Sequence, residues 1–485
     1  MDKPMLEWIN ESFLEAVLQG GERQESSISI IKFTVSPAVP PGHNYLSYIY
    51  RVQVHYKPTN SENLLSLSLI VKIPVKEGYF GTISNKGNLF KKEIKIYNTF
   101  FPRICEKCKF DLAPKSFKSP NESNLILKDL IEDGYTMCDK IKNLDFKYCK
   151  HVIVTLAKFH AASVSLHHED PNFVEDIGKE VVINENMISI QKPVLEYCVR
   201  TVAKIAKETY GHEVLAEFLL KNLENLWESI VEIYRRKEEG LNVLNHGDLW
   251  INNILFKTDD FGEVIDVKFI DFQFSRYSSP VLDLLFFFWG SADEVVREYR
   301  LQDLCKVYLQ TLNNSLRDLD CVERLTLEEL NHGFKSSSDL FIFILCQLMP
   351  GMYSDTEDDY DVAHVKFPSG DTSDLESSDY LESKLKSHSS FANLNPLAAL
   401  ESVIELGGLP GKRRKLVNAV YSQQHRNNAP YLHFIATQLI KKVINQVREQ
   451  IYWNQIYRAS EYIFVSISVC ACECVCVRKC VSARE

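Results

Sequence analysis

The chain has 485 residues, of which 45% are hydrophobic, and it carries a formal net charge of −10. This length exceeds what one hydrophobic core usually serves, so we expect two lobes or two domains. The acidic charge and the lack of a block rich in lysine and arginine argue against a nucleic-acid-binding protein, because neutralising phosphates needs a basic surface. The expected partners are small molecules or proteins.

The first residues mix acids into a helical pattern and lack the basic and apolar regions of a secretory signal. The longest apolar runs fall short of the roughly 20 residues of a membrane span, and each contains an acid, Asp283 or Glu473. Thirteen cysteines, an odd number, suit reduced thiols better than a disulfide framework. We therefore expect a cytoplasmic protein that does not enter a membrane, and we expect it to be a monomer.

Residues 1 to about 20 have a helical pattern. Two alternating stretches between residues 26 and 57 flank Pro40, Pro41 and Gly42, which indicates a hairpin. The stretch LLSLSLIVKIPV, residues 64–75, predicts a further strand. Its two-residue period places Lys72 on the face opposite the apolar row of Leu67, Leu69 and Val71.

The stretch NLFKKEIKIYNTFF, residues 88–101, has apolar residues at helical spacing, with Glu93 beside the buried stripe where it could face the sheet. The stretch SNLILKDLIEDGY, residues 123–135, predicts a short strand that ends in a turn. A five-stranded sheet with one helix, closed by a connector near Lys128 to Gly134, would form a small amino-terminal lobe over residues 1–131.

A larger, mainly helical lobe is expected over residues 132–440. The stretch YCKHVIVTLAKFHAASVSL, residues 148–166, predicts an amphipathic helix, and helical patterns recur from about Ser279 to Gly351. Between them, NNILF and VIDVKFIDF, residues 252–256 and 264–272, predict a hairpin. The predicted fold class is α+β, with two lobes.

Three segments suggest less. Residues 354–390 are expected to form a solvated, mobile loop. Their first part, residues 354–382, contains ten acidic residues and one lysine. Cys105 and Cys108 form one CxxC pair without a second pair nearby, which favours plain thiols over a zinc site. The end of the extension 441–485 fits a soft-metal cluster less well than a disordered or non-native terminus; its cysteines are Cys470, Cys472, Cys474, Cys476 and Cys480.

Polar residues interrupt the apolar stretch VLNHGDLWINNILF, residues 243–256. Asp248 and Asn253 lie five residues apart on the loop that precedes the predicted hairpin, and Asp271 ends the second strand of that hairpin. Because a hairpin returns its end to where it began, we expect these three side chains to converge. His246 is expected to fix the loop by hydrogen bonding.

Phosphoryl transfer from ATP needs a cation for the phosphates, oxygen ligands for Mg²⁺ and a carboxylate that receives the acceptor's proton. Asn253 and Asp271 could hold Mg²⁺, which would leave Asp248 free to act as the base. Each residue type is also common in turns and caps. It is their combination at this spacing that favours phosphoryl transfer.

The motif HGDLWINN followed by IDFQ resembles the catalytic loop and metal motif of the kinase-like phosphotransferases, which include aminoglycoside and choline kinases. More narrowly, HGDLWINNILF, VKFIDFQFSRYSSPVLDLLFFFWGS and LAKFHAAS resemble the insect ecdysteroid kinase-like family, also called the CHK kinase-like domain. The similarity runs from EWINESFLEAVL to about Met352. It implies a bilobal protein-kinase-like fold and a kinase that uses ATP and Mg²⁺ to phosphorylate a hydroxyl of an apolar, steroid-like alcohol.

Position by position, the resemblance implies that Asp248 is the base, that Asn253 and Asp271 hold Mg²⁺, and that Lys72, oriented by Glu93, contacts the ATP phosphates. The remaining nucleotide-binding positions that it implies are Gly42, Asn44 and Ser47 in a covering turn, and Lys128, Asp129 and Leu130 in a hinge whose backbone meets adenine.

The short path from Asp271 to the next helix, and Gly247 where protein kinases carry arginine, favour a small-molecule acceptor over a protein. An aromatic run, residues 286–289, has Asp283 as its only nearby acid, which favours an apolar acceptor, although core packing explains the run as well and Asp283 could simply brace the loop. The alternatives are a kinase of a cationic amino alcohol or xenobiotic, which would need an acidic pocket, and a pseudokinase that acts as an interaction module.

Overall fold

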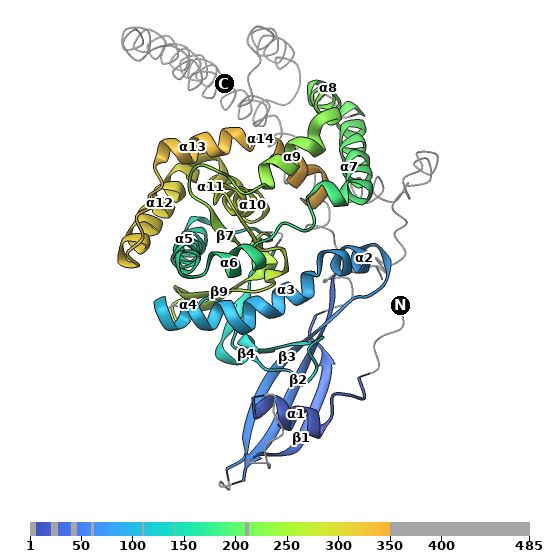
Figure 1. The fold of residues 1–485 in the computed structure, drawn as a ribbon, viewed down its shortest axis with the longest axis vertical. Coiled ribbons are helices and arrows are strands. Elements are labelled where there is room, and N and C mark those ends of the chain that lie inside the picture. Colours follow the sequence, from blue (N-terminus) through green and yellow to red (C-terminus); the bar gives the residue numbers. More distant parts are fainter. Residues whose placement is uncertain are drawn as a thin grey trace, which may run out of the picture. The chain divides into compact units, whose positions relative to one another are not determined.

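The computed structural model describes residues 6–20, 28–39, 46–59, 63–108, 111–140, 142–208 and 213–349. Gly42, Asn44, the acidic stretch 354–390 and the extension 441–485 lie outside the described residues. Within the described part, the mixed α+β class predicted from the sequence is confirmed, with an antiparallel sheet in the amino-terminal part and helices dominating the rest (Figure 1).

The amino-terminal sheet has five strands in the order β1-β2-β3-β5-β4, and its pairings are antiparallel. The strands are β1 (Ile28–Pro37), β2 (Ser47–Pro58), β3 (Leu65–Pro74), β4 (Ser116–Phe117) and β5 (Leu125–Lys128). Helix α1 (Glu11–Leu18) packs on this sheet, with Leu14 and Val17 against Val52 and Leu69. The side chain of Asn10 caps α1 by accepting a hydrogen bond from the Phe13 amide.

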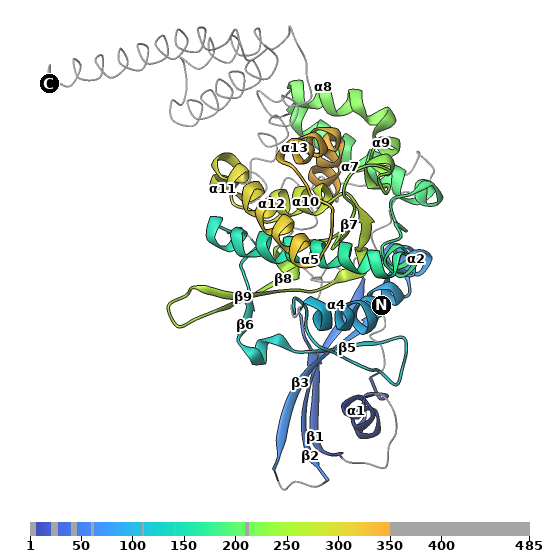
Figure 2. The same ribbon diagram turned by 60° about the vertical axis from the view of Figure 1, so that its left-hand side comes forward.

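A nearly continuous helical stretch follows the sheet's third strand. It consists of α2 (Gly78–Gly87), α3 (Leu89–Lys95), a π-helical turn (Ile96–Phe100) and α4 (Phe101–Cys108). Figures 1 and 2 show α3 and α4 lying between the sheet and the helical part of the chain. The π-helical turn comes directly after the helix that carries Glu93, a location typical of functional sites.

The rest of the described chain holds two small antiparallel sheets among helices. The strands β6 (Tyr135–Met137), β8 (Ile254–Thr258) and β9 (Val264–Phe269) form one, and β7 (Val243–Asn245) with β10 (Arg276–Ser278) forms the other. The β8–β9 pairing confirms the predicted hairpin. The helices are α5 (Phe146–Glu169), α6 (Pro171–Ile177), α7 (Ile188–Glu208), α8 (Glu213–Asn222), α9 (Leu226–Tyr234), α10 (Val281–Gly290), α11 (Glu294–Tyr299), α12 (Leu301–Asp318), α13 (Leu327–Ser336) and α14 (Ser338–Phe343).

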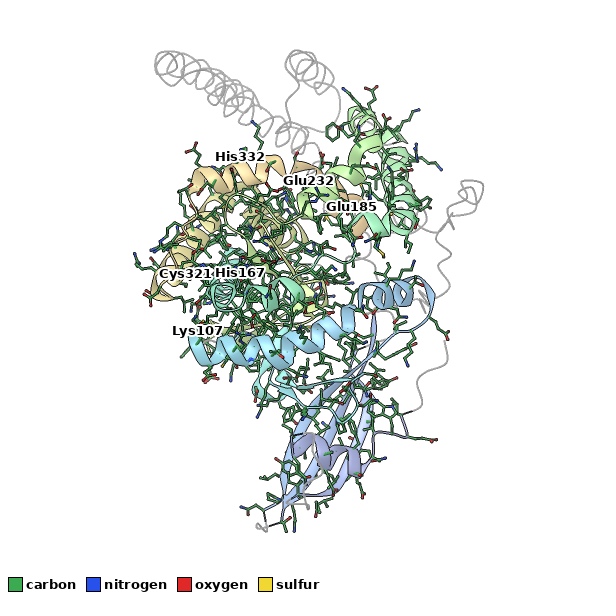
Figure 3. The ribbon with its side chains drawn as sticks, in the orientation of Figure 1. Lys107, His167, Glu185, Glu232, Cys321 and His332 are labelled. Carbon is green, nitrogen blue, oxygen red and sulfur yellow. The ribbon has the colours of Figure 1, made fainter. Side chains whose placement is uncertain are left out.

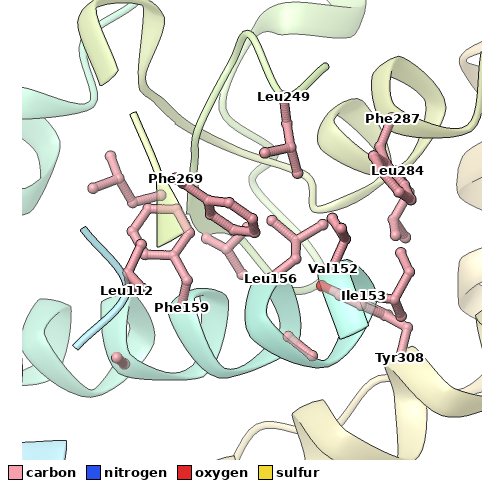
Figure 4. Packing of buried hydrophobic residues seen from close by; sticks show 14 of the residues in the cluster. Leu112, Val152, Ile153, Leu156, Phe159, Leu249, Phe269, Leu284, Phe287 and Tyr308 are labelled. Atoms are coloured by element: carbon pink, nitrogen blue, oxygen red, sulfur yellow. The ribbon is translucent and has the colours of Figure 1, made fainter. Parts of the chain in front are cut away.

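Helix α5 lies at the centre of the main core. Figure 4 shows Val152, Leu156 and Phe159 of α5 packed against Leu249 and Phe269. Small residues on its other sides are buried as well, which explains why the helix is apolar over much of its circumference. The core thereby joins α5 to the loop after β7 and to the end of β9, where the polar residues of interest lie.

The aromatic run of residues 286–289 belongs to this packing. Phe286, Phe287 and Phe288 are buried, and Trp289 contacts Phe341 edge to face. Core packing is therefore the correct interpretation of the run, and it offers no open apolar surface to an acceptor. Among the helices of the described residues, none is both long enough and apolar enough to cross a membrane.

Candidate active site

Lys72 is held between two carboxylates from different parts of the chain. Strand pairing sets Lys72 opposite Ile49 and Leu125 in the middle of the sheet. Its Nζ lies 2.9 and 2.8 Å from the two carboxylate oxygens of Glu93, and 2.8 Å from Oδ1 of Asp271. Burial disfavours the charged form, but Asp271 and Glu93 outweigh it and raise the pKa of Lys72 above its usual value. The lysine therefore stays protonated.

The loop after β7 depends on glycine at one position. Gly247 has φ +83°, a conformation that L side chains rarely adopt. A Cβ atom added there would lie 2.1 Å from the carbonyl oxygen of Phe274. The close approach of these two backbones explains why the motif reads HGD, since any side chain at residue 247 would push the loop away from residues 272–274.

Asp248, Asn253 and Asp271 come together as the hairpin argument predicts. The Asn253 amide donates to the carbonyl and to Oδ2 of Asp248 over 2.8 and 3.0 Å. The backbone amide of Ile270 donates to the Asn253 carbonyl over 3.0 Å, which sets Asp271 beside Asn253. Asp271 itself has φ 69°, a left-handed conformation uncommon for residues other than glycine.

Asp248 is suited to exchange a proton near neutral pH. It is partly exposed at the surface of the site, yet the protein packed around its carboxyl group raises its pKa to about 7, with a further contribution from the charge of Asp271. The hydrogen bond from Asn253 opposes this shift without cancelling it. A carboxyl group with such a pKa can accept a proton from a hydroxyl and release it again.

The donor set beside Asp248 fits a magnesium ion. Asn253 uses its Nδ2 for Asp248, so its Oδ1 remains without a hydrogen bond from the described residues. Asp271 uses Oδ1 for Lys72, and its Oδ2 likewise accepts none from them. Two oxygen atoms, one amide and one carboxylate, on adjacent backbone segments match the ligands that Mg²⁺ takes together with phosphate and water.

Asp283 holds the loop after β7, which carries Asp248, in place through hydrogen bonds. Its carboxylate accepts hydrogen bonds from the backbone amides of His246 and Gly247 over 2.6 and 2.8 Å. A third bond, 3.1 Å long, joins it to Nε2 of His160, whose Nδ1 lies 2.7 Å from the hydroxyl of Tyr308. Burial opposes the charge of Asp283, but the bonds from His160 and the amides outweigh it and lower its pKa. The imidazole of His246 bonds to the Ile270 carbonyl over 2.9 Å, so it fixes the loop as expected.

Phe272, the residue after Asp271, packs against the α3–α4 stretch on one side and α5 on the other. Its ring is fully buried and lies edge to face with Tyr97 and Phe101 of the α3–α4 stretch and with Phe159 of α5. The imidazole of His246 packs on it with the ring centres 4.4 Å apart. Because these rings belong to separate elements, their packing fixes Asp271 relative to the helix that carries Glu93.

A buried arginine lies on the other side of Asp248. Arg276 of β10 pairs with Glu180, whose carboxylate lies 2.9 Å from its Nε, and its guanidinium lies over the ring of Tyr234. The other Glu180 oxygen accepts from the amides of Val182 and Ile183 over 2.7 Å. The charge of Arg276 acts to lower the pKa of Asp248, but burial and the charge of Asp271 outweigh it.

Sequence reasoning missed several of these residues. His160 lies within the motif LAKFHAAS, but nothing in its pattern reveals the bonds to Asp283 and Tyr308. Arg276 follows Asp271 by five residues, and nothing in the short strand RYS that contains it signals its contact with Glu180.

The remaining predicted positions have varied surroundings. Ser47 begins β2 and is buried opposite Pro74. The backbone amides of Lys128 and Asp129 already donate to the carbonyls of Lys115 and Ser68 over 2.8 and 3.0 Å. Any contact of this segment with adenine must therefore use other atoms, for example those of Leu130.

Asp129 and Asn252 differ in how they are bonded. The side chain of Asp129 accepts from Arg51 and Ser68 over 2.6 and 2.8 Å, which gives it a structural task. The side chain of Asn252 makes no hydrogen bond with the described residues.

A protonated lysine, a carboxyl base and paired oxygen ligands are what transfer of a phosphoryl group demands, and with the two-part fold they define a kinase-like phosphotransferase. The chain belongs to the ecdysteroid kinase-like family, whose model matches residues 41–321. Its enzyme class is that of small-molecule kinases, which phosphorylate hydroxyl groups. The resemblance inferred from the motifs is thus confirmed.

Solved structures with similar folds include a spectinomycin phosphotransferase with ADP and spectinomycin, at 13% identity and a TM-score of 0.37, covering 77% of this chain and 94% of that one. A choline kinase from Streptococcus pneumoniae has 13% identity and a TM-score of 0.33, with 76% and 94% covered. A glucosamine kinase with glucosamine, ADP and phosphate has 10% identity and a TM-score of 0.33, with 66% and 77% covered. No curated protein matches the chain.

Proposed function

We propose that this enzyme transfers the γ-phosphate of ATP, with Mg²⁺, to a hydroxyl group of an apolar, uncharged alcohol of the steroid type. One observation carries the proposal: the five expected residues come together in two bonded groups. Lys72 contacts Glu93 and Asp271 over 2.8–2.9 Å, and Asn253 donates to Asp248 over 2.8 and 3.0 Å. The backbone bond from Ile270 to Asn253 holds the two groups beside each other. A pseudokinase would usually lack a member of this set, so its completeness favours catalysis over a role as an interaction module.

Each residue then has a defined task. Lys72, kept protonated by its two carboxylates, would bind the phosphates of ATP. Asp248 would take the proton of the acceptor hydroxyl while that oxygen bonds to the γ-phosphorus and the bond to the departing ADP breaks. Mg²⁺, held by Asn253 and Asp271, would supply positive charge to the phosphate oxygens. Ser47 and the hinge residues Lys128, Asp129 and Leu130 would lie around the nucleotide, with Gly42 and Asn44 covering it.

The charges around Asp248 favour an uncharged acceptor. A cationic acceptor needs carboxylates or an aromatic cage beside the transferred group. Glu180, the carboxylate that lies against Arg276 on this flank, is engaged by Arg276 and by two backbone amides. Because Arg276 and Glu180 neutralise each other, Glu180 offers no free carboxylate to an ammonium group. The steroid class itself rests on the family resemblance.

Charge and cysteine usage further favour a cytoplasmic monomer, and we place its lobes at residues 1–131 and 132–440, followed by an extension over residues 441–485. Gel filtration of the purified chain tests whether it is a monomer. An elution volume that corresponds to twice the 55.9 kDa mass of the chain would contradict the monomer.

The acceptor is tested by ADP release from purified protein, ATP and Mg²⁺ with equal concentrations of an ecdysteroid, choline or kanamycin. We expect faster release with the ecdysteroid than with either cation. Faster turnover of choline or kanamycin would contradict the uncharged acceptor and leave the kinase assignment in place. If no alcohol of a broad panel stimulates ADP release, the result would favour the pseudokinase.

A further inference from the structure

Three potential metal ligands converge at a site remote from the nucleotide residues. One ligand atom from each of His168, Cys321 and Glu323 lies within 4.8 Å of the other two. His168 is in the last turn of α5, and the other two residues lie between α12 and α13. Figure 3 shows Cys321 beside the end of α5, close to the labelled His167, with Lys107 of α4 nearby.

The backbone between α12 and α13 places Cys321 and Glu323 on the side of the segment that faces His168. Asp320 has φ 57°, and the Cys321 amide donates to the Leu316 carbonyl over 2.9 Å, which turns the chain sharply after α12. Cys321 is 3% exposed, whereas Val322 is 87% exposed. In an extended segment alternate residues share a side, so Cys321 and Glu323 both face inward.

Glu323 carries an oxygen that nothing among the described residues satisfies. Its Oε1 lies 2.6 Å from Nε2 of His168. Its Oε2 is buried and has no hydrogen-bond partner within the described ranges. A buried carboxylate oxygen without a partner is costly, and an ion that binds it would remove that cost.

We propose that His168, Cys321 and Glu323 bind a zinc ion. One imidazole nitrogen, one thiolate and one carboxylate form a mixed donor set that suits Zn²⁺ better than Mg²⁺ or Ca²⁺, which prefer oxygen. A water molecule would complete the tetrahedral coordination. The ion would fasten the end of α5 to the α12–α13 segment.

The test uses the full chain with its five tail cysteines changed to serine, because these could bind metal independently. After treatment with a chelator, the protein is incubated with Zn²⁺, separated from free ions and measured for zinc by mass spectrometry. We expect one zinc ion per chain. Zn²⁺, but not Mg²⁺, should also raise the thermal unfolding midpoint.

Single variants then assign the ligands. Cys321→Ser and His168→Gln should each lose the bound zinc, because each removes one of the three protein ligands. Matched controls are His167→Gln, the neighbouring histidine, and Cys138→Ser, a thiol elsewhere in the fold; both should retain zinc.

Zinc retained in Cys321→Ser and His168→Gln, or absent from the parent chain, would overturn the site. Circular dichroism identifies a variant that has unfolded, and cobalt spectra of the folded parent chain, which report thiolate and tetrahedral coordination, then decide. None of these measurements depends on kinase activity.

Discussion

The two carboxylate oxygens of Asp271 have different roles. One accepts a hydrogen bond from Lys72, and the other is available to bind a metal ion. We predict that Asp271→Ala abolishes the Mg²⁺-dependent part of ATP binding. Calorimetric titration of ATP with and without Mg²⁺ measures it. Asp260→Ala, which removes an exposed acid from the β8–β9 turn, is the control and should keep the metal effect. An unchanged metal effect in Asp271→Ala would place the ligand elsewhere.

Gly247 allows a second prediction for a single residue. Gly247→Ala should destabilise the protein by about 2 kcal/mol more than Gly262→Ala, the order of the penalty for overpacking. Both glycines have positive φ, 83° and 77°, so both changes incur the left-handed penalty. At Gly262, however, a Cβ atom meets nothing within 4 Å.

Urea unfolding of the two glycine variants measures the difference. Equal destabilisation would show that the loop moves away from the Phe274 carbonyl without cost. In that case the glycine would not be fixed by the close approach of the two backbones.

Among the elements, the catalytic loop, α5, α10 and α12 depend on one another through Asp283. We predict that Asp283→Asn lowers stability by about 3 kcal/mol, as expected when one partner of a buried charged network is removed. Turnover should fall while ATP affinity changes little, because the loop that carries Asp248 is displaced and Lys72 is not. Urea unfolding and steady-state kinetics separate the two effects.

This network also has a pH signature. The pKa of Asp283 is lower in the folded protein than its reference value of 3.8, so the charge stabilises the fold above pH 4 and loses this effect as the pH falls through the folded pKa. The stability difference between wild type and Asp283→Asn should therefore be constant from pH 7 to about 5 and shrink below pH 4. A difference that shrinks already between pH 7 and 6 would contradict a carboxylate brace.

Periodicity and hairpin geometry predict elements well and networks poorly. The two-residue period placed Lys72 opposite the apolar row, and the hairpin predicted that Asp271 returns to Asp248; both are confirmed by the structure. The pairs His160–Asp283 and Glu180–Arg276 join residues 123 and 96 positions apart, and no local pattern encodes such distances. The π-helical turn after α3 also leaves no signal, since its residues read as an ordinary helix.

For the molecule as a whole, the proposed catalytic residues are shared between the sheet and the helical region. Lys72 comes from the sheet, Glu93 from α3, and Asp271 from the segment after β9, while Phe272 packs on both helical layers. Catalysis therefore requires that these parts remain docked.

The family match ends at residue 321, well before the final segment of the chain. We predict that a chain cut just before Glu461 stays folded, binds ATP and keeps its turnover within about twofold of the full chain. ATP titration and kinetics check this prediction. Loss of ATP binding would show that residues 461–485 are needed for the fold.

The proposed role of Asp248 as the base in phosphoryl transfer is tested most directly by following the acceptor itself. The full chain, ATP, Mg²⁺ and a steroid alcohol are incubated, and mass spectrometry measures the alcohol that has gained one phosphoryl group. The account predicts a phosphorylated product whose rate of formation falls by ~10² or more in Asp248→Asn, with ATP affinity nearly unchanged, because removing a general base acts on the transition state. A phosphorylated product formed equally fast by Asp248→Asn would contradict the assigned base, and the absence of a phosphorylated alcohol with the wild-type chain would contradict the steroid acceptor.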